Sequence, residues 1–455
     1  MQDREAGVPL GNVDAMLRRE QDLFVQRHPR SKALAARAKA HWAHGVPMHW
    51  MLDWGTPFPI YVASAKGACL TDVDGNAYDD FCFGDTGSMF GHSPEPIAKA
   101  ITEQAARGLT YMLPTEDVPE VGELLANMFG LPFWQAATTA TDANRFVIRW
   151  CRAIIKRSKI LVFHGCYHGA ADDTFVRLKN GKAIHRPGLL GQVFDLTQFT
   201  KVVEFNDLPA LETALAEGDV ACVLTEPALT NIGMVLPQPG FLEGLRALTR
   251  KHGTLLVIDE THTISTGYGG YTRTHGLEPD FLTVGKPIAG GIPCAVFGFT
   301  AAVEARMRRV EAEKEPGYSG MGTTLSANAL ALHAMRANLE QVVTPAAYDH
   351  MLPMSERLAR GIEARIKARR LPWHVSNVGA RAEFVCSAQR PRNGTEAQAA
   401  MHPRLELAIH LYLLNRGFII APFHNMTLVS PATSAEQVDR LVAAVDGCLG
   451  ELLGA

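Results

Sequence analysis

An aspartate and a lysine follow two short apolar segments in the middle of the chain. Asp259 comes directly after the run Leu255-Leu-Val-Ile258, and Lys286 closely follows Phe281-Leu-Thr-Val284. Each run is typical of a buried strand. Glycines stand on both sides of the lysine, where backbone can approach a ligand closely. If the two strands are parallel, a carboxylate and an amine meet at the sheet edge where ligands bind.

A lysine and an aspartate placed in this way suit pyridoxal phosphate (PLP). The amine of Lys286 can form a Schiff base with the cofactor aldehyde, while the carboxylate of Asp259 keeps the pyridine nitrogen protonated. A protonated ring accepts the electrons left when a proton leaves a substrate carbon. Taken singly, a strand-end aspartate is more often a cap or an ion-pair partner, and a lysine is usually solvated. Only their joint placement indicates the cofactor.

Three further segments strengthen this prediction. Thr138–Asn144 opens a predicted helix, whose N–H groups and hydroxyls favour an anion such as a phosphate, although hydroxyl residues are also ordinary N-caps. Tyr167 follows the strand predicted at 160–163 and can stack on a flat ring, although it can equally be a core tyrosine. Glu226 follows the strand predicted at 221–224 and adds an acid at the same edge.

The elements that must position these residues alternate between strand and helix. From about residue 95 to 300, apolar runs at 160–163, 221–224 and 255–258 are separated by helical patterns such as 241–252. This alternation predicts a parallel sheet with helices on both faces.

The two ends of the chain have a different pattern. Residues 12–44 predict a helix, and residues 59–82, with the turn Asp74-Gly75-Asn76, predict an antiparallel meander. Further helices are predicted at about 328–339, 346–369 and 434–453, and strands at 372–386, 417–421 and 426–430. These segments predict a second, smaller unit.

Composition excludes several classes of protein. The chain has 455 residues, of which 47% are hydrophobic and 20% charged, and its net charge is −3, so no broad basic field is present to bind nucleic acid. Eight cysteines lie far apart without a C-x-x-C pair, which favours reduced thiols over a zinc site or a disulfide framework. No secretory signal and no apolar run of about 18 residues is visible, so we expect a cytoplasmic protein without a membrane partner.

The order of the motifs resembles that of the class III (omega) aminotransferases. The shared stretches are Thr138-Thr-Ala-Thr-Asp-Ala-Asn144, Tyr167-His-Gly169, Glu226-Pro227, Ile258-Asp-Glu260 and Gly285-Lys-Pro-Ile-Ala-Gly-Gly-Ile-Pro293. The last is most similar to the branch that contains glutamate-1-semialdehyde aminomutase and beta-amino-acid aminotransferases. Other similar stretches are Pro57-Phe-Pro-Ile-Tyr61, Asp72-Val-Asp-Gly-Asn76, Gly91-His92 and Thr323-Thr-Leu-Ser-Ala-Asn328. The likeness therefore runs from about Gly45 to Gly447.

The resemblance implies an α/β protein with the fold of a fold-type I PLP enzyme. Such an enzyme has a large doubly wound, mostly parallel sheet domain and a small α+β domain drawn from both chain ends. We expect residues 1–85 to contribute to the small domain, 86–335 to form the large PLP-binding domain, and 336–455 to complete the small domain. The family is a homodimer whose subunits share active sites.

The resemblance also implies a role for each matched residue. Lys286 would be the Schiff-base lysine and proton shuttle, and Asp259 would pair with the pyridine nitrogen. The other expected cofactor contacts are Thr139, Ala140 and Thr141 at the phosphate, Thr324 reaching the phosphate from the partner subunit, Tyr167 and Thr261 against the two ring faces, Glu226 at the same edge, and His262. His262 could bond the phenolic oxygen of the cofactor or simply pack.

Some residues depart from the family pattern. Ala140 stands where the phosphate turn usually has glycine, so its φ must be negative. The segment Ala421-Pro-Phe-His-Asn425 lacks the arginine that often binds a substrate carboxylate. Arg381 could replace that arginine, or it could be an ordinary surface residue. Trp54, Asp85 and Thr86 lie in stretches that line the substrate pocket in relatives. We therefore expect a pocket for an aromatic, hydrophobic or otherwise unusual amine or amino acid.

These expectations predict an aminotransferase that moves an amino group from an amine donor to a keto-acid acceptor by a ping-pong mechanism. A PLP-dependent aminomutase or amino-acid racemase shares every motif above and is the alternative. A binding protein that has lost its chemistry would retain the fold but has no need of Lys286 and Asp259. Nucleotide binding is disfavoured, because the glycines around Lys286 fit neither G-x-x-x-x-G-K-[ST] nor G-x-G-x-x-G.

Overall fold

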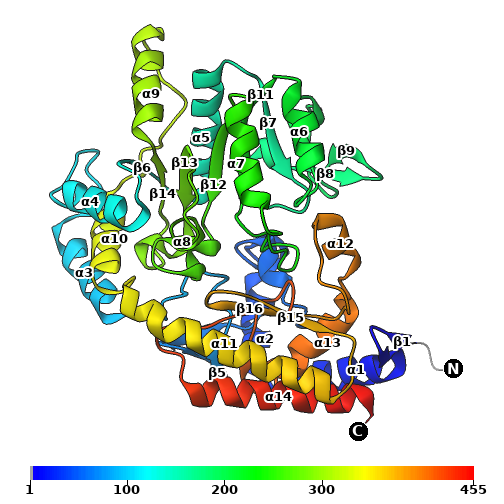
Figure 1. Ribbon diagram of the computed structural model, residues 1–455. Coiled ribbons are helices and arrows are strands. Elements are labelled where there is room, and N and C mark those ends of the chain that lie inside the picture. The colour runs from blue at the N-terminus through cyan, green and yellow to red at the C-terminus, as the bar shows by residue number, and fades with distance from the viewer. Residues whose placement is uncertain (1–3, 455) are drawn as a thin grey trace. The chain divides into compact units, whose positions relative to one another are not determined.

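The computed structural model describes residues 4–454, which divide into two compact units. Unit 1 is formed by the chain up to Pro94, by Ala346–Arg390 and by the chain from Ala400 onward. Unit 2 is formed by Glu95–Pro345 together with Pro391–Ala399. Both chain ends therefore contribute to unit 1, and the middle of the chain forms unit 2 (Figure 1).

Unit 2 is built on a seven-stranded sheet. Its strands, in order across the sheet, are β10 (Thr200–Val203), β7 (Lys159–Phe163), β11 (Val220–Thr225), β12 (Leu255–Asp259), β13 (Phe281–Val284), β14 (Ala295–Phe299) and β6 (Phe133–Ala137). The first five are parallel to one another, and β14 is antiparallel to both of its neighbours. The predicted parallel sheet is therefore confirmed.

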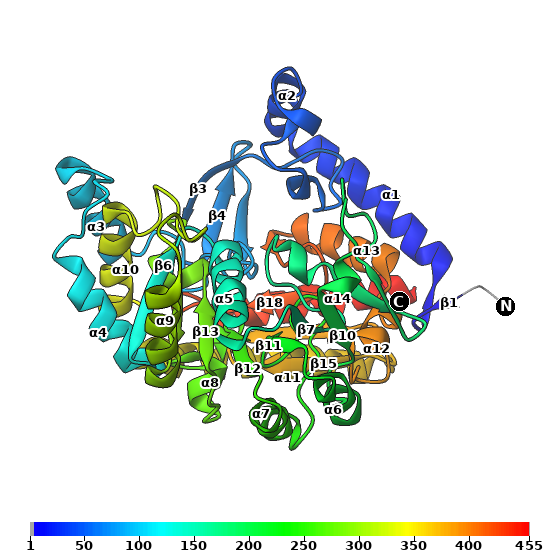
Figure 2. The same cartoon turned by 90° about the horizontal axis from the view of Figure 1, so that it is seen from above.

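The inner strands β7, β11, β12, β13 and β14 are buried on both faces, because they are mostly apolar. In β7, Ile160 and Val162 pack on one face beneath α5 (Ala140–Ile155) and α9 (Ala301–Glu313). Leu161 and Phe163 pack on the other face beneath α6 (Leu208–Ala216) and α7 (Phe241–Lys251). Figure 2 shows the two helical layers on opposite sides of the strands. The remaining elements of unit 2 are α3 (Glu95–Arg107), α4 (Asp117–Phe129), β8 (Val176–Lys179), β9 (Lys182–His185), α8 (Gly270–Thr274), α10 (Ala329–Gln341) and α12 (Gly394–Ala399).

Unit 1 contains a four-stranded sheet, a three-stranded sheet, the two-stranded pair of β1 (Arg4–Glu5) and β2 (Val8–Pro9), and four longer helices. The four-stranded sheet has the order β17 (Phe418–Ile419), β5 (Ala77–Asp80), β4 (Cys69–Asp72) and β3 (Val62–Lys66), and the three-stranded sheet has the order β15 (His374–Val378), β16 (Arg381–Val385) and β18 (Met426–Leu428). The parallel pair β17–β5 joins the two ends of the chain. The longer helices are α1 (Leu10–Arg27), α11 (Pro345–Ala368), α13 (Pro403–Leu414) and α14 (Ala435–Leu453), and α2 (Pro29–Ala38) completes the unit.

The helix predicted over residues 12–44 is wrong as a single element. It is two helices, α1 and α2, which meet at His28 (φ −125°, ψ 49°). Because Pro29 follows, the α conformation is disfavoured at His28. The His28 ring is buried at the bend, with Nδ1 2.7 Å from the Phe24 carbonyl and Nε2 2.7 Å from the Tyr78 hydroxyl.

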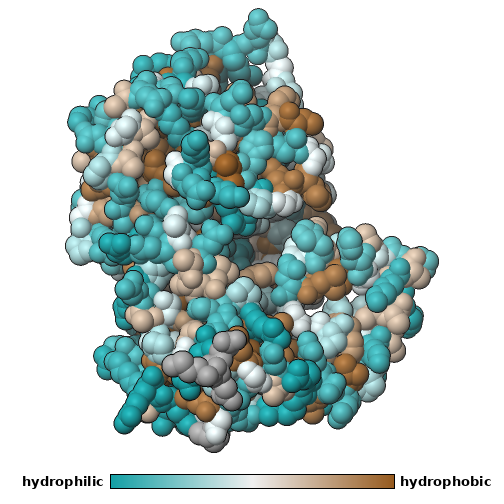
Figure 3. All heavy atoms as spheres, turned by 90° about the vertical axis from the view of Figure 1, so that its right-hand side faces the viewer, coloured by the Kyte–Doolittle hydropathy of each residue, from teal (hydrophilic) through white to brown (hydrophobic). Residues whose placement is uncertain are grey.

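All eight cysteines are unpaired, and six of them are buried. No helix within residues 4–454 is long and apolar enough to cross a membrane. In the same part of the chain, no group of three or more His, Cys, Asp or Glu side chains is arranged to hold a metal ion. Figure 3 shows one face of the molecule, on which hydrophilic residues are interspersed with smaller hydrophobic patches.

Candidate cofactor site

Asp259, the last residue of β12, is the centre of a buried hydrogen-bond network in unit 2. The amide of Asn144 donates to Oδ2 at 2.9 Å, and Nδ1 of His168 lies 2.9 Å from the same oxygen. The N–H of Thr261 donates to Oδ1 at 3.1 Å. Asn144 is itself fixed by the hydroxyl of Thr283, which donates to its Oδ1 at 2.9 Å. The network sets the orientation of the carboxylate at the end of the strand.

The Asp259–His168 pair is charged. Burial would raise the pKa of Asp259, but the hydrogen bond and charge of His168 outweigh burial and lower the pKa to about 2. Burial would likewise lower the pKa of His168, but Cys166 and Asp259 together raise it well above its usual value. Asp259 therefore stays anionic at neutral pH and can hold a proton on a basic ring nitrogen.

Lys286 follows β13, the neighbour of β12, and begins the short 3-10 helix η6 (Lys286–Ala289). Its φ of +42° is a strained conformation for a residue with a side chain. Asn338 of α10 holds the segment in place by donating to the carbonyls of Pro287 at 2.8 Å and Ile288 at 2.9 Å. The Nζ atom of Lys286 lies 2.7 Å from Nε2 of His262. The half-buried lysine is thus fixed at the same sheet edge as Asp259.

The N-terminus of α5 adjoins this edge and suits an anion. Thr139 is the N-cap, and its hydroxyl accepts from the N–H of Asp142 at 3.2 Å. Ala140 is the first helical residue, so the condition that its φ be negative is met and its methyl group is tolerated. A Cβ on Gly285 would lie 2.7 Å from the Cβ of Ala140, which explains why the residue before the lysine is glycine. Thr141 accepts the N–H of Ala170 at 3.0 Å, which ties the helix start to the loop after β7.

The remaining predicted cofactor residues also lie in unit 2. Tyr167 is 39% exposed, and the guanidinium of Arg186 lies 5.6 Å from the centre of its ring. Thr261 is buried, and its hydroxyl accepts from the N–H of Gly285 at 3.2 Å. Thr324 is exposed, in a loop whose neighbouring residue Thr323 lies 3.3 Å from the hydroxyl of Thr138.

Glu226, at the end of β11, has a different charge state from Asp259. It is buried and accepts the hydroxyl of Thr230 at 2.5 Å. Burial raises its pKa to about 7, because the opposing effects of His168 and Thr230 are smaller. Two carboxyl groups on adjacent strands thus have pKa values near 2 and near 7, because only Asp259 has His168 as a hydrogen-bonded partner.

The four predicted substrate residues belong to unit 1. Trp54 and Asp85 are half-buried, and Thr86 is fully buried. The interpretation of Arg381 as a surface residue is wrong, because it is 0% exposed. Its Nη2 donates to the hydroxyl of Thr86, and its Nη1 lies 3.1 Å from Sδ of Met426. Strand β16 was expected here, but its pattern did not indicate which face is buried.

Three residues that hold Asp259 or the segment of Lys286 in place were not assigned a role from the sequence. His168 and Asn144 lie inside motifs that the sequence singles out, but their motifs do not say that both side chains turn toward Asp259. Asn338 lies in a predicted helix and belongs to no motif. A polar residue on the buried face of an amphipathic helix was the available clue, since such a residue must find a hydrogen-bond partner.

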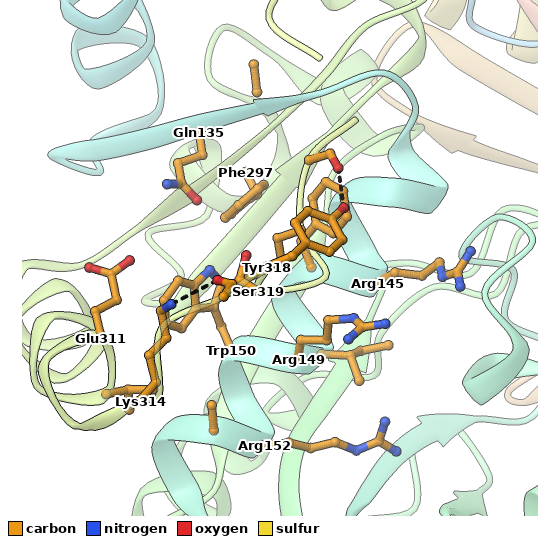
Figure 4. A pocket seen from close by; sticks show the side chains of 18 of the residues that line it. Gln135, Arg145, Arg149, Trp150, Arg152, Phe297, Glu311, Lys314, Tyr318 and Ser319 are labelled. Atoms are coloured by element: carbon orange, nitrogen blue, oxygen red, sulfur yellow. Dashed lines mark hydrogen bonds between the residues drawn. The ribbon is translucent and has the colours of Figure 1, made fainter. Parts of the chain in front are cut away.

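A cavity of about 1040 Å³ opens elsewhere in unit 2 (Figure 4). Arg145, Arg149 and Arg152 extend into it from α5, and Lys314 and Tyr318 line its other side. None of the predicted cofactor residues lines this cavity.

Comparisons with known proteins agree with this geometry. A family model described as aminotransferase class-III matches residues 51–449. The glutamate-1-semialdehyde 2,1-aminomutase of Myxococcus xanthus is 34% identical over 428 residues, which cover 92% of this chain and 97% of the relative.

Two solved structures show the same fold. A glutamate-1-semialdehyde-aminomutase from Pseudomonas aeruginosa PAO1 has a TM-score of 0.96 and 49% identity, covering 98% of this chain and all of that chain. A second structure of that bacterial protein shows its K286A variant in complex with PMP. A beta-phenylalanine aminotransferase from Variovorax paradoxus has a TM-score of 0.86 and 25% identity, covering 96% of this chain and 97% of that one.

Proposed function

Because the chain belongs to the class III aminotransferase family, we propose that Lys286 and Asp259 are the central residues of an enzyme that moves an amino group. The fold is that of a fold-type I enzyme, and the cofactor is pyridoxal phosphate. When bound, this cofactor supplies an aldehyde that links to amines and a ring that takes up electrons. The chain supplies the orientation, the charges and the proton transfers.

The residues of unit 2 fit this cofactor. The anionic Asp259 would hold a proton on the ring nitrogen, and the start of α5, with Thr139, Ala140 and Thr141, would bind the phosphate. Tyr167 and Thr261 would contact the two faces of the ring, and Thr324 of the partner subunit would complete the phosphate site. Lys286 holds or releases a proton at Nζ, and His262, 2.7 Å away, orients it. Glu226, protonated or ionised near neutral pH, adds a second titrating group at the sheet edge.

We infer that the amino group moves within one substrate, as in an aminomutase. The sequence alone favoured transfer between two substrates, with the aminomutase as the alternative. The curated relatives named above are glutamate-1-semialdehyde 2,1-aminomutases, and they support the alternative more strongly. The observation that carries the chemistry is that Asp259, paired with His168, ends β12, the neighbour of the strand that Lys286 follows.

The proposal is tested by supplying glutamate-1-semialdehyde to the PLP-loaded protein without any keto acid. We expect the isomer whose amino group has moved from carbon 2 to carbon 1, detected by chromatography. Absence of this isomer, in a preparation that retains PLP, contradicts the aminomutase proposal.

Transamination is the second candidate. It is supported by the structural similarity to the beta-phenylalanine aminotransferase and by the likeness of the lysine motif to that branch. A donor such as 3-amino-3-phenylpropanoate together with pyruvate gives alanine if the enzyme transfers amino groups between substrates. An aminomutase specific for one substrate gives none.

We also propose that the protein is a homodimer. The segment 109–113 of unit 2 exposes four large apolar side chains, Leu109, Tyr111, Met112 and Leu113. The N–H of Leu330 donates to the carbonyl of Leu109, which places this segment beside the chain that follows Thr324. Exposed apolar groups clustered in this way favour a protein partner. Light scattering during gel filtration is expected to give twice the mass of 49.5 kDa, and a monomer contradicts the proposal.

A further inference from the structure

The turn Phe83–Thr86 of unit 1 has an unusual backbone. Four consecutive residues have positive φ, namely 47° at Phe83, 57° at Gly84, 51° at Asp85 and 84° at Thr86. Only Gly84 adopts this region freely, and a β-branched threonine is a genuine outlier there. Such a conformation persists only where surrounding contacts fix it, and it concentrates at functional sites.

The first group of contacts comes from the preceding strand. Asp80, at the end of β5, accepts the N–H groups of Cys82 at 2.7 Å and Phe83 at 2.9 Å through Oδ1. Its other oxygen lies 2.7 Å from Nε2 of His92, whose ring packs against that of Phe83. These contacts fix the beginning of the turn.

Arg381 fixes the end of the turn. It reaches Thr86 from β16, which lies 295 residues later in the chain, and both side chains are completely buried. Its other terminal nitrogen contacts Met426 in the neighbouring strand β18. The guanidinium is therefore occupied by groups of its own unit on two sides.

Charges of opposite sign accompany this buried cation. Burial would lower the pKa of His424, but Glu383 and Asp85 outweigh burial and the opposing charge of Arg381, so the pKa is raised. Asp85, Glu383 and Arg381 thus all act on the same buried histidine of unit 1. Glu383 lies two residues along β16, on the same face of the strand, and its Oε1 is 2.9 Å from Nδ1 of His424.

We propose that Arg381 is a positioning residue, which holds the turn Phe83–Thr86 in its strained conformation and does not bind a substrate carboxylate. This inference rests on the proposed function, since it concerns how the substrate side of that enzyme is shaped. Its consequence is that amines with and without a carboxylate depend equally on Arg381. If Arg381 instead bound a substrate carboxylate, only amines that carry a carboxylate would depend on it.

The first experiment measures the turn itself and needs no turnover. Hydrogen–deuterium exchange of peptides covering residues 80–92 is compared in the wild type, Arg381→Met, Thr86→Val and Thr86→Ser. Losing a buried hydrogen bond to a charged group corresponds to about 10- to 100-fold faster exchange in Arg381→Met and in Thr86→Val. Thr86→Ser keeps the accepting hydroxyl and should keep the protection. Unchanged exchange in both Arg381→Met and Thr86→Val overturns the proposal.

The second experiment uses two donors that differ only in a carboxylate, 3-amino-3-phenylpropanoate and 1-phenylethylamine, with pyruvate. This experiment applies to the second candidate function, in which the wild type transaminates both donors; kcat/KM of Arg381→Met is then expected to fall by the same factor for both, about 10- to 100-fold. A rise in KM confined to the carboxylate donor overturns the proposal. Arg390→Met, which alters an exposed arginine of the same unit, is the matched control and should behave as the wild type.

The two experiments separate this inference from the proposed function. If the wild type transfers no amino group from either donor, transamination fails as a function, while the exchange measurement still decides the role of Arg381. If Arg381→Met does not fold, the pair Thr86→Val and Thr86→Ser decides it.

Discussion

Two buried polar clusters of the molecule have different physical roles. In unit 2, Asn144 of α5, His168 of the loop after β7 and Thr283 of β13 surround Asp259 at the end of β12, and the hydrogen bonds of this cluster stabilise a charge. In unit 1, Asp80 and Arg381 hold a turn whose backbone is itself strained. The first cluster preserves an ionisation state, and the second preserves a shape. Substitutions in the first cluster should therefore change the catalysed reaction, and substitutions in the second should change the local order of the turn backbone.

The largest expected effect is that of Lys286→Ala. In the proposed function, removing Nζ removes both the covalent attachment to the cofactor and the proton carrier, so turnover should fall by at least about 10²–10⁴-fold. Turnover of the isomerisation is measured in variants reconstituted with PLP. Lys314→Ala, which changes a lysine on the wall of the cavity in Figure 4, is the control. Near wild-type turnover of Lys286→Ala would remove this lysine from the mechanism.

Asp259→Asn tests the charge-preserving cluster directly. The amide has the shape of the carboxylate but cannot hold a proton on the ring nitrogen, so we expect turnover to fall about 10²–10³-fold. Absorption spectra of the bound cofactor should change with the loss of the charge. Retained PLP, measured after dialysis, separates lost binding from lost chemistry. A variant with an unchanged spectrum and unchanged turnover contradicts the role given to Asp259.

Glu226→Gln tests the contrast between the two carboxyl groups. In the folded protein the pKa of Glu226 is raised to about 7, whereas in the unfolded chain it titrates near 4.5. Between these values the folded protein holds a proton that the unfolded chain has released, so the free energy of unfolding falls as pH rises through this window. Glutamine does not titrate. The variant should therefore gain about 3 kcal/mol relative to the wild type between pH 4.5 and pH 7.5.

Urea unfolding at the two pH values measures this gain, and the difference between them cancels effects of the substitution that do not depend on pH. Glu315→Gln, at an exposed position, is the matched control. A stability difference that is the same at both pH values would mean that Glu226 does not carry the raised pKa.

The contrast between the clusters also explains what the sequence could predict. Asp259 and Lys286 follow apolar runs, so their place at the sheet edge follows from strand periodicity and a parallel order. His168 lies 91 residues from Asp259, and no local pattern says which way its ring turns. The burial of Arg381 depends on Thr86, 295 residues away, and an arginine is normally expected at the surface. Local patterns predict elements, whereas long-range polar partners depend on the completed fold.

The break between α1 and α2 was missed for a different reason. The proline at position 29 is a local signal for a break, but the helical periodicity continues across it and predicts one helix. In the turn Phe83–Thr86, Gly84 and Asp85 are types common in turns, but Phe83 and Thr86 seldom adopt positive φ, so the run of four positive φ values has no signal in the sequence.

The smallest expected effect tests the shape-preserving cluster. In Asp80→Asn, the side-chain oxygen can still accept the N–H groups of Cys82 and Phe83, but the charge is lost and the amide faces His92. Exchanging charge-assisted hydrogen bonds for neutral ones should lower the free energy of unfolding by about 1–2 kcal/mol. Hydrogen exchange in residues 80–92 should rise more than the exchange of β12 in unit 2, since the loss is local to the turn.

Asp53→Asn, which changes an exposed aspartate of the same unit, should leave both measurements unchanged. If Asp80→Asn speeds hydrogen exchange in β12 as much as in the turn, the loss of stability is spread over the whole protein. The turn would then not be a locally held shape, and the division of the molecule into a charge-preserving and a shape-preserving cluster would fail.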